Sequence, residues 1–131
     1  MPLSRAITKA YRPLLEPLRL TYPQYLVLLV LWEKGDCTVK DLSYALQLDS
    51  GTLSPLLKRL EAMKLVTRNR SRIDEREVDI GLTAKGLAFR QKVASVPERI
   101  GCSMGLTAES QRQLRQELRV LTENVSNNIP E

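Results

Sequence analysis

Residues 38–83 of the chain, TVKDLSYALQLDSGTLSPLLKRLEAMKLVTRNRSRIDEREVDIGLT, decide its fold. The stretch begins with two short segments in which leucines recur every three or four residues, as they do on one face of a helix. Turn-forming Asp49, Ser50 and Gly51 separate the two segments. After Lys64 the apolar period changes to two, which is typical of strands. This order of helix, turn, helix and hairpin predicts a winged helix-turn-helix, which presents one helix and one hairpin to duplex DNA.

The second helix of the stretch is the predicted recognition helix. Its apolar face carries Leu53, Leu56, Leu57, Leu60 and Met63. Because successive residues are about 100° apart around a helix, the opposite face carries Gly51, Pro55, Lys58 and Ala62, flanked by Thr52, Ser54 and Arg59. Small residues let a helix enter the major groove, hydroxyl groups bond to bases or phosphates, and cations neutralise phosphates. Either Ser50 or Ser54 is expected to cap this helix, and only the second choice gives Pro55 the favoured first position.

Residues 66–82 form the predicted wing. Val66, Arg68, Arg70 and Arg72 share one parity, and the tip is Ile73-Asp74-Glu75. Arginines at a hairpin tip suit the narrow minor groove, where the potential is most negative. Asp74 is expected to hold one of these arginines by a charge-assisted hydrogen bond. The predicted DNA contacts are Ser50, Gly51, Thr52, Ser54, Pro55, Lys58, Arg59, Arg68, Arg70, Arg72, Asp74 and Arg76.

Three segments resemble the MarR-type repressors, and more narrowly their organic-hydroperoxide-responsive (OhrR-type) branch. They are LTYPQYLVLLVLWE at residues 20–33, LDSGTLSPLLKRLE at 48–61 and RSRIDEREVDIGLTAKG at 70–86. The likeness covers residues 5–125 and implies a homodimer that represses an organic-peroxide response gene from a palindromic operator. It also implies that Asp74 and Arg76 form the wing pair, and that Tyr11 and Tyr22 match tyrosines around the reactive cysteine.

One feature of that branch is absent from the sequence. Its peroxide-reactive cysteine lies upstream of the segment SRAITKAYRPLL, here residues 4–15, where this sequence has none. We therefore expect either a longer native chain or a variant with a changed sensor. Cys102 matches the region of the resolving cysteine in two-cysteine members, and a nearby Arg99 and a loop position make it the better redox candidate.

The sensor or ligand pocket is predicted at Tyr11, Tyr22, Tyr25 and Cys102. In one interpretation the tyrosines surround an oxidised thiol or a small aromatic ligand between the dimer helices and the DNA-binding lobe. In the other they only pack at a helix interface, with each hydroxyl group finding a partner. Cys37, next to Asp36 at a helix start, is interpreted as an ordinary small residue.

The rest of the chain predicts helices around this lobe. A first helix carries Leu3, Ile7, Ala10, Leu14 and Leu18 and is kinked or split by Pro13 and Pro17. A buried helix opens at Pro23 and stops at Gly35. Thr83 is expected to cap a long helix, which Pro97 bends or ends early. The apolar residues of this helix are Leu87, Val93, Val96 and Ile100. Gly101 and Gly105 mark a break after it. A last helix from Thr107 carries Leu114, Leu118, Leu121 and Val125.

These outer apolar stripes have no evident partner inside a small winged-helix core. We therefore expect a homodimer, with packing inside one chain as the alternative. Residues 1–131 are predicted to form one domain, in which 1–22 and 84–131 are dimerisation helices and 23–83 the DNA-binding lobe. A two-fold dimer places its recognition helices about 34–36 Å apart, which favours a palindromic site.

The composition fits this prediction. The chain has 131 residues, a net charge of +5, two distant cysteines and no histidine. The charge suits a phosphate-binding partner, and the cysteines suit a reducing, cytoplasmic setting. No apolar run reaches the roughly 20 residues that span a bilayer. No enzyme, metal or cofactor is expected, because the commonest general base is missing and no phosphate loop is present. The alternative function is that of a winged-helix module that binds other proteins and not DNA.

Overall fold

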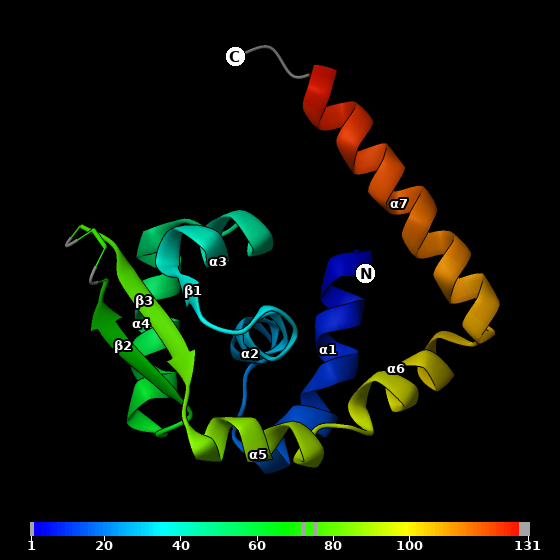
Figure 1. Cartoon of the computed structure of the whole chain (residues 1–131). Helices are drawn as coiled ribbons and strands as arrows, with labels where there is room; N and C mark the ends of the chain where they lie inside the picture. The colour runs from blue at the N-terminus through cyan, green and yellow to red at the C-terminus, as the bar shows by residue number, and fades with distance from the viewer. Residues whose placement is uncertain (1, 72, 75, 129–131) are drawn as a thin grey trace. The chain divides into compact units, whose positions relative to one another are not determined.

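The computed structural model describes residues 2–71, 73–74 and 76–128 and confirms the mainly helical winged helix-turn-helix (Figure 1). Its elements are α1 (Leu3–Leu15), the 3-10 helix η1 (Glu16–Leu18), α2 (Tyr22–Lys34), β1 (Cys37–Thr38), α3 (Val39–Leu46), α4 (Ser50–Ala62), β2 (Val66–Arg70), β3 (Val78–Leu82), α5 (Ala84–Lys92), α6 (Val96–Met104) and α7 (Ala108–Asn128). They form two compact units, Met1–Ala94 and Ser95–Glu131.

Helix α2 is the centre of the first unit. It contacts α1, α3, α4, α5 and β3, and its residues Val27, Leu28 and Leu31 are almost completely buried. Thr21 and Gln24 close a capping box at its start, with Pro23 in the first turn as predicted. The indole N–H of Trp32 donates a 2.9 Å hydrogen bond to the carbonyl of Gly86, which ties α2 to α5.

The helix-turn-helix is fixed by side-chain caps at both of its helices. Thr38 caps α3 by accepting a hydrogen bond from the N–H of Asp41, and the Asp41 carboxylate accepts a hydrogen bond from the Thr38 N–H in return. The expected caps of α4 are wrong: Asp49 is the N-cap, and its carboxylate accepts a 2.7 Å hydrogen bond from the N–H of Thr52. A carboxylate at this position pairs with a backbone N–H that has no partner within the helix, and its charge interacts favourably with the positive end of the helix dipole. Pro55 therefore lies inside α4.

The wing belongs to a three-stranded antiparallel sheet of order β1-β3-β2. Strand β3 pairs with β2 through Arg68 and Ile80, and with β1 through Cys37 and Ile80. Ile80 is completely buried at the middle of the sheet. Strand β1 was not predicted, because two residues carry no periodic signal.

The region after the wing departs from the predicted long helix. Thr83 caps α5 as predicted, but α5 ends at Lys92 and α6 begins at Val96, with Pro97 in its first turn. Only Gly105, with φ of +67°, ends α6, so the expected break at Gly101 is wrong. Gly101 is buried within α6, and a Cβ there would lie 2.8 Å from the Gln111 amide nitrogen. The glycine therefore allows a close approach between α6 and α7.

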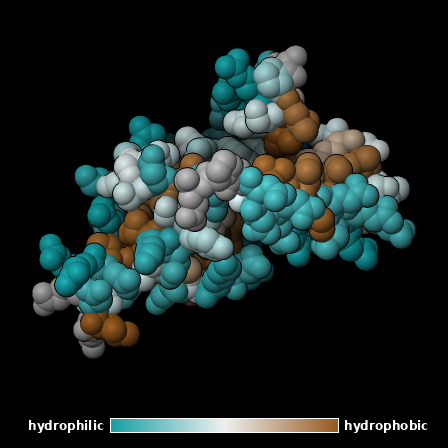
Figure 2. All heavy atoms as spheres, turned by 90° about the horizontal axis from the view of Figure 1, so that it is seen from above, coloured by the Kyte–Doolittle hydropathy of each residue, from teal (hydrophilic) through white to brown (hydrophobic). Residues whose placement is uncertain are grey.

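Apolar residues of the outer helices reach the surface. On α7, Leu114, Leu118, Leu121 and Val125 are 44–57% exposed, although they follow a regular helical spacing. On α1, Leu3 of the predicted stripe is exposed, and the buried residue is Leu15. Figure 2 shows hydrophobic residues at the surface among hydrophilic ones. Among the described residues, no helix is both long and apolar enough to cross a membrane.

Candidate nucleic-acid interface

Helix α4 separates an apolar inner face from a polar outer face. Leu53, Leu57 and Leu60 are buried, and the helix packs against α2, α3 and β2. The outer residues Ser50, Gly51, Thr52, Pro55, Lys58 and Arg59 are exposed, and Ser54 is half-buried. This face offers hydroxyl groups and two cations on a surface with few bulky side chains, which suits insertion into a major groove.

The start of this helix also carries an ionised carboxylate. Hydrogen bonds from the Thr52 side chain, and then from its backbone, hold the pKa of Asp49 below its usual range. Asp49 therefore keeps its charge and its capping role at neutral pH. It fixes the first turn of α4, from which Ser50, Gly51 and Thr52 are presented to solvent.

The tip of the wing is a folded turn. Ser71 is buried, and its hydroxyl oxygen accepts hydrogen bonds from the N–H groups of Ile73 (3.2 Å) and Asp74 (3.4 Å). The Asp74 carboxylate accepts a 3.0 Å hydrogen bond from the N–H of Arg76, where the sequence predicted a bond to a guanidinium group. The turn closes through bonds from the Ser71 N–H to the Glu77 carbonyl and from the Glu77 N–H to the Asp74 carbonyl, both 2.9 Å.

The predicted wing contacts differ in their access to solvent. Arg70, Asp74 and Arg76 are exposed, and Arg72 lies outside the described residues. Arg68 is half-buried on the side of β2 that also carries Val66, and it is registered opposite Ile80. Its Nε atom is buried and has no hydrogen-bond partner among the described residues. The shared parity with Val66 was the sequence signal for this inward position.

The tyrosines of the predicted sensor pocket do cluster. The Tyr11 ring lies 4.7 Å from the Tyr22 ring and 5.7 Å from the Tyr25 ring, measured between centroids. Tyr25 is only 2% exposed. Burial raises the pKa of Tyr11 and of Tyr25, and the neighbouring tyrosines raise both further. These phenols therefore remain neutral in ordinary conditions.

The two cysteines differ in surroundings. Cys37 is buried in β1, and its thiol donates to the Gly35 carbonyl at 3.2 Å. Burial, followed by the charge of Asp41, raises the pKa of this thiol, which lowers the fraction present as the reactive thiolate. Cys102 is exposed, but it lies within α6 rather than in the loop that the sequence predicted. The tyrosine cluster belongs to the first unit and Cys102 to the second.

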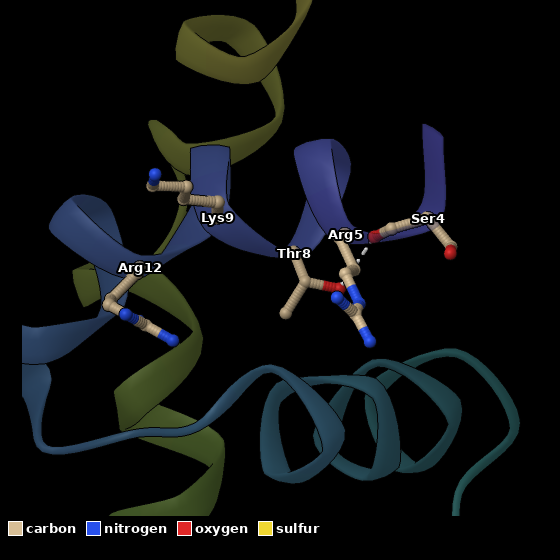
Figure 3. Close-up of a pocket in the computed structure, with 5 residues that line it drawn as sticks. All are labelled: Ser4, Arg5, Thr8, Lys9 and Arg12. Atoms are coloured by element: carbon tan, nitrogen blue, oxygen red, sulfur yellow. Dashed lines mark hydrogen bonds between the residues drawn. The ribbon is translucent and has the colours of Figure 1, made fainter. Parts of the chain in front are cut away.

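A row of cations on α1 was not singled out from the sequence. Helix α1 contains Arg5, Lys9 and Arg12 but no acidic residue. Together with Ser4 and Thr8 these cations line a hollow. The side chains of Arg5, Thr8 and Arg12 point to the same side of α1, whereas Lys9 points away from that side (Figure 3). The spacing of three and four residues was the available signal. The row adds to the positive field of the chain, which attracts polyanions over a distance.

Among the described residues, no group of three metal-ligating side chains is placed to hold a metal ion.

Comparison with known proteins places these features in a family. A family model described as transcriptional regulator SarA/Rot matches residues 9–93. The organic hydroperoxide resistance transcriptional regulator of Bacillus subtilis is 50% identical over 113 residues, which are 86% of this chain and 75% of that protein. The regulator TtmR of Methylorubrum extorquens is 51% identical over 111 residues, which are 85% of this chain and 57% of that protein.

Solved structures agree with this comparison. The structure of reduced AbfR bound to DNA, a protein of Staphylococcus epidermidis, superposes with a TM-score of 0.76 at 34% identity. The match covers 94% of this chain and 86% of AbfR.

Proposed function

This chain belongs to the MarR family of winged-helix transcriptional regulators, and we propose that it acts as a dimeric repressor of an organic-peroxide response. The observation that carries the DNA-binding role is the pairing of the outer face of α4 with a hydrogen-bonded wing tip in one compact unit. In the proposed complex, α4 occupies a major groove and the wing an adjacent minor groove. Lys58, Arg59, Arg70 and Arg76 neutralise phosphates or enter the minor groove.

The dimer is proposed from the exposed stripe on α7. Residues Leu114, Leu118, Leu121 and Val125 are each about half exposed, and a second copy of the chain would cover them. A two-fold pair repeats every DNA contact, so the operator should be a palindrome whose half-sites lie about one helical turn apart.

Selection of duplexes from a random library by the purified chain tests this proposal. We expect enrichment of a palindrome with half-site centres about 10 base pairs apart. Affinity for that operator should exceed affinity for a scrambled duplex by about a thousandfold at physiological salt. Failure to enrich any duplex, with equal weak binding at low salt, would instead favour the protein-interaction module.

Peroxide is the proposed input signal, supported by the name of the B. subtilis relative. Of the two cysteines, Cys102 is exposed and Cys37 is buried with a raised pKa, so Cys102 is the thiol that a hydroperoxide reaches. Attack of its thiolate on the hydroperoxide would give a sulfenic acid on the protein and release the corresponding alcohol.

A titration of the operator complex with cumene hydroperoxide tests this input. Release of DNA by the wild-type chain and by Cys37→Ser, but not by Cys102→Ser, supports the proposal. Retention of DNA by all three proteins would exclude direct peroxide sensing by this chain while leaving operator binding intact.

A small aromatic ligand is the second candidate input, favoured by the tyrosine cluster. The rings of Tyr22 and Tyr25 lie 4.7 Å and 5.7 Å from the ring of Tyr11, and aromatic rings gathered in this way can stack on an aromatic guest. Thermal-shift screening of phenolic compounds against wild type and Tyr22→Ala separates this input from the peroxide route, because the shift should disappear in the variant.

A further inference from the structure

The tip of the wing exposes an apolar side chain that the recognition scheme above does not use. Ile73 is 98% exposed, between polar and charged neighbours. Single exposed apolar residues are common on protein surfaces, so exposure alone has little meaning. Two further features, the backbone hydrogen bonds at Ile73 and Asp74 and the charged residues near them, distinguish this isoleucine.

The position of Ile73 is fixed by its backbone. Its N–H group donates a 3.2 Å hydrogen bond to the hydroxyl oxygen of Ser71, a residue that is 7% exposed. The next N–H group, of Asp74, donates to the same oxygen, and the Asp74 carboxylate holds the N–H of Arg76. A β-branched side chain is also stiff about χ1. Ile73 therefore loses little conformational freedom when it meets a partner.

The charges beside Ile73 indicate which partner it meets. Arg70 is the last residue of β2 and Arg76 lies in the turn before β3, and both are exposed. Arginines in this arrangement are drawn into the narrow minor groove by its negative potential. The side chain of Ile73, which lies between these two arginines in the sequence, would arrive at the groove with them, where it can contact sugars and base edges or wedge between base steps.

We propose that Ile73 is an apolar minor-groove contact that makes the wing discriminate A·T from G·C pairs. The minor groove of an A·T pair presents acceptors only, whereas guanine adds its N2 amino group. Methyl groups packed over that amino group would bury a donor without a partner, which is costly. The proposal rests on wing binding in the proposed function and adds a sequence preference at the operator positions beneath each tip.

Inosine gives a direct test, because an inosine·C pair has the major-groove pattern of G·C but lacks the N2 amino group. Three versions of the selected operator carry A·T, inosine·C or G·C pairs under the wings. We expect the wild-type chain to bind the first two within about twofold and the G·C version about tenfold more weakly. In Ile73→Ala the ratio of the affinity for the A·T version to the affinity for the G·C version should fall to about two. The affinity for the A·T version itself should drop about tenfold. Ile73→Val should keep most of both effects.

Two comparison variants separate the possible failures. Leu29→Ala removes a partly exposed apolar side chain from α2, outside both the wing and the predicted dimerisation helices, and should leave the ratio unchanged. Arg76→Ala should weaken binding and flatten the salt dependence by about one unit, whereas Ile73→Ala should leave the salt dependence unchanged. The proposal is overturned if Ile73→Ala keeps both affinity and ratio while Arg76→Ala loses affinity. If neither variant changes binding, the wing does not contact DNA, and that part of the proposed function fails as well.

Discussion

The carboxylate of Asp74 accepts a 3.0 Å hydrogen bond from the backbone N–H of Arg76. Arg76, a predicted DNA contact, is thus positioned through its backbone, while its side chain stays exposed. Asp74→Ala should loosen the turn and weaken operator binding about fivefold to tenfold, the effect of losing about one hydrogen bond. Fluorescence anisotropy with labelled operator measures this change.

Asp74→Asn is the matched control for that change. The amide oxygen of asparagine can still accept the bond from the Arg76 N–H, but the negative charge is gone. We expect Asp74→Asn to bind as well as the wild type or slightly better, because a like charge near the phosphates has been removed. Equal losses in Asp74→Ala and Asp74→Asn would show that charge, not turn geometry, is what matters.

Lys58 on the outer face of α4 should act as a phosphate contact. Its removal in Lys58→Ala should weaken binding to all duplexes alike and reduce the slope of log affinity against log salt by about one unit. Lys92→Ala removes an exposed lysine from α5 and serves as the charge control. A change in sequence preference, or an identical slope in wild type and Lys58→Ala, would contradict the assignment.

The sequence predicted the helices and the wing because their signals are local. Thr83 caps α5 as the pattern predicted, and the predicted inner leucines Leu53, Leu57 and Leu60 of α4 are buried. The predictions that were wrong depend on choices between competing local signals or on tertiary contacts. Asp49 and Ser50 are both good caps, and only the backbone geometry selects Asp49.

Other departures come from contacts that are remote in sequence. Gly101 resembles a helix breaker, but it lies within α6, where the absence of a Cβ leaves room for the side chain of Gln111. Strand β1 exists because β3 offers it an edge. Arg68 was grouped with the wing cations, but it is half-buried opposite Ile80 on the side of β2 that carries Val66. The DNA-contact assignments and the sensor residues remain predictions, since they concern partners.

Asp49 predicts a specific effect of acid on stability. Its folded-state pKa is depressed by hydrogen bonds from Thr52, so the carboxylate stabilises the folded chain above its unfolded pKa of about 3.9. That contribution is lost as the pH falls through the lower, folded-state pKa. Urea unfolding of wild type and Asp49→Asn should therefore differ in pH dependence only below about pH 4. Asparagine also caps well, so similar midpoints are expected at pH 7.

The tyrosine cluster predicts that the folded chain loses stability at alkaline pH. Burial raises the folded-state pKa of Tyr25 and of Tyr11 above the ordinary value of 10.0. The stability linked to these neutral phenols is fully present below about pH 10 and is lost as the pH rises through the folded-state values. Tyrosinate absorbance at 295 nm should show a late component that Tyr25→Phe reduces, because only the late ionisation of Tyr11 then remains. A variant that titrates like the wild type would mean that Tyr25 ionises freely.

The exposed stripe on α7 gives a test of the dimer. Leu118 is 52% exposed in the middle of α7, and covering it in a dimer would remove apolar surface from water. Leu118→Glu should place a charge in that interface and shift the sedimentation of the chain from dimer toward monomer at micromolar concentration. Because a monomer binds only one half-site, operator affinity should fall by at least a hundredfold, while affinity for a single half-site stays the same.

The control is Arg115→Glu, which reverses a charge on an exposed residue of α7 outside the stripe and should leave the dimer intact. A Leu118→Glu chain that remains dimeric would assign the dimer interface to other residues.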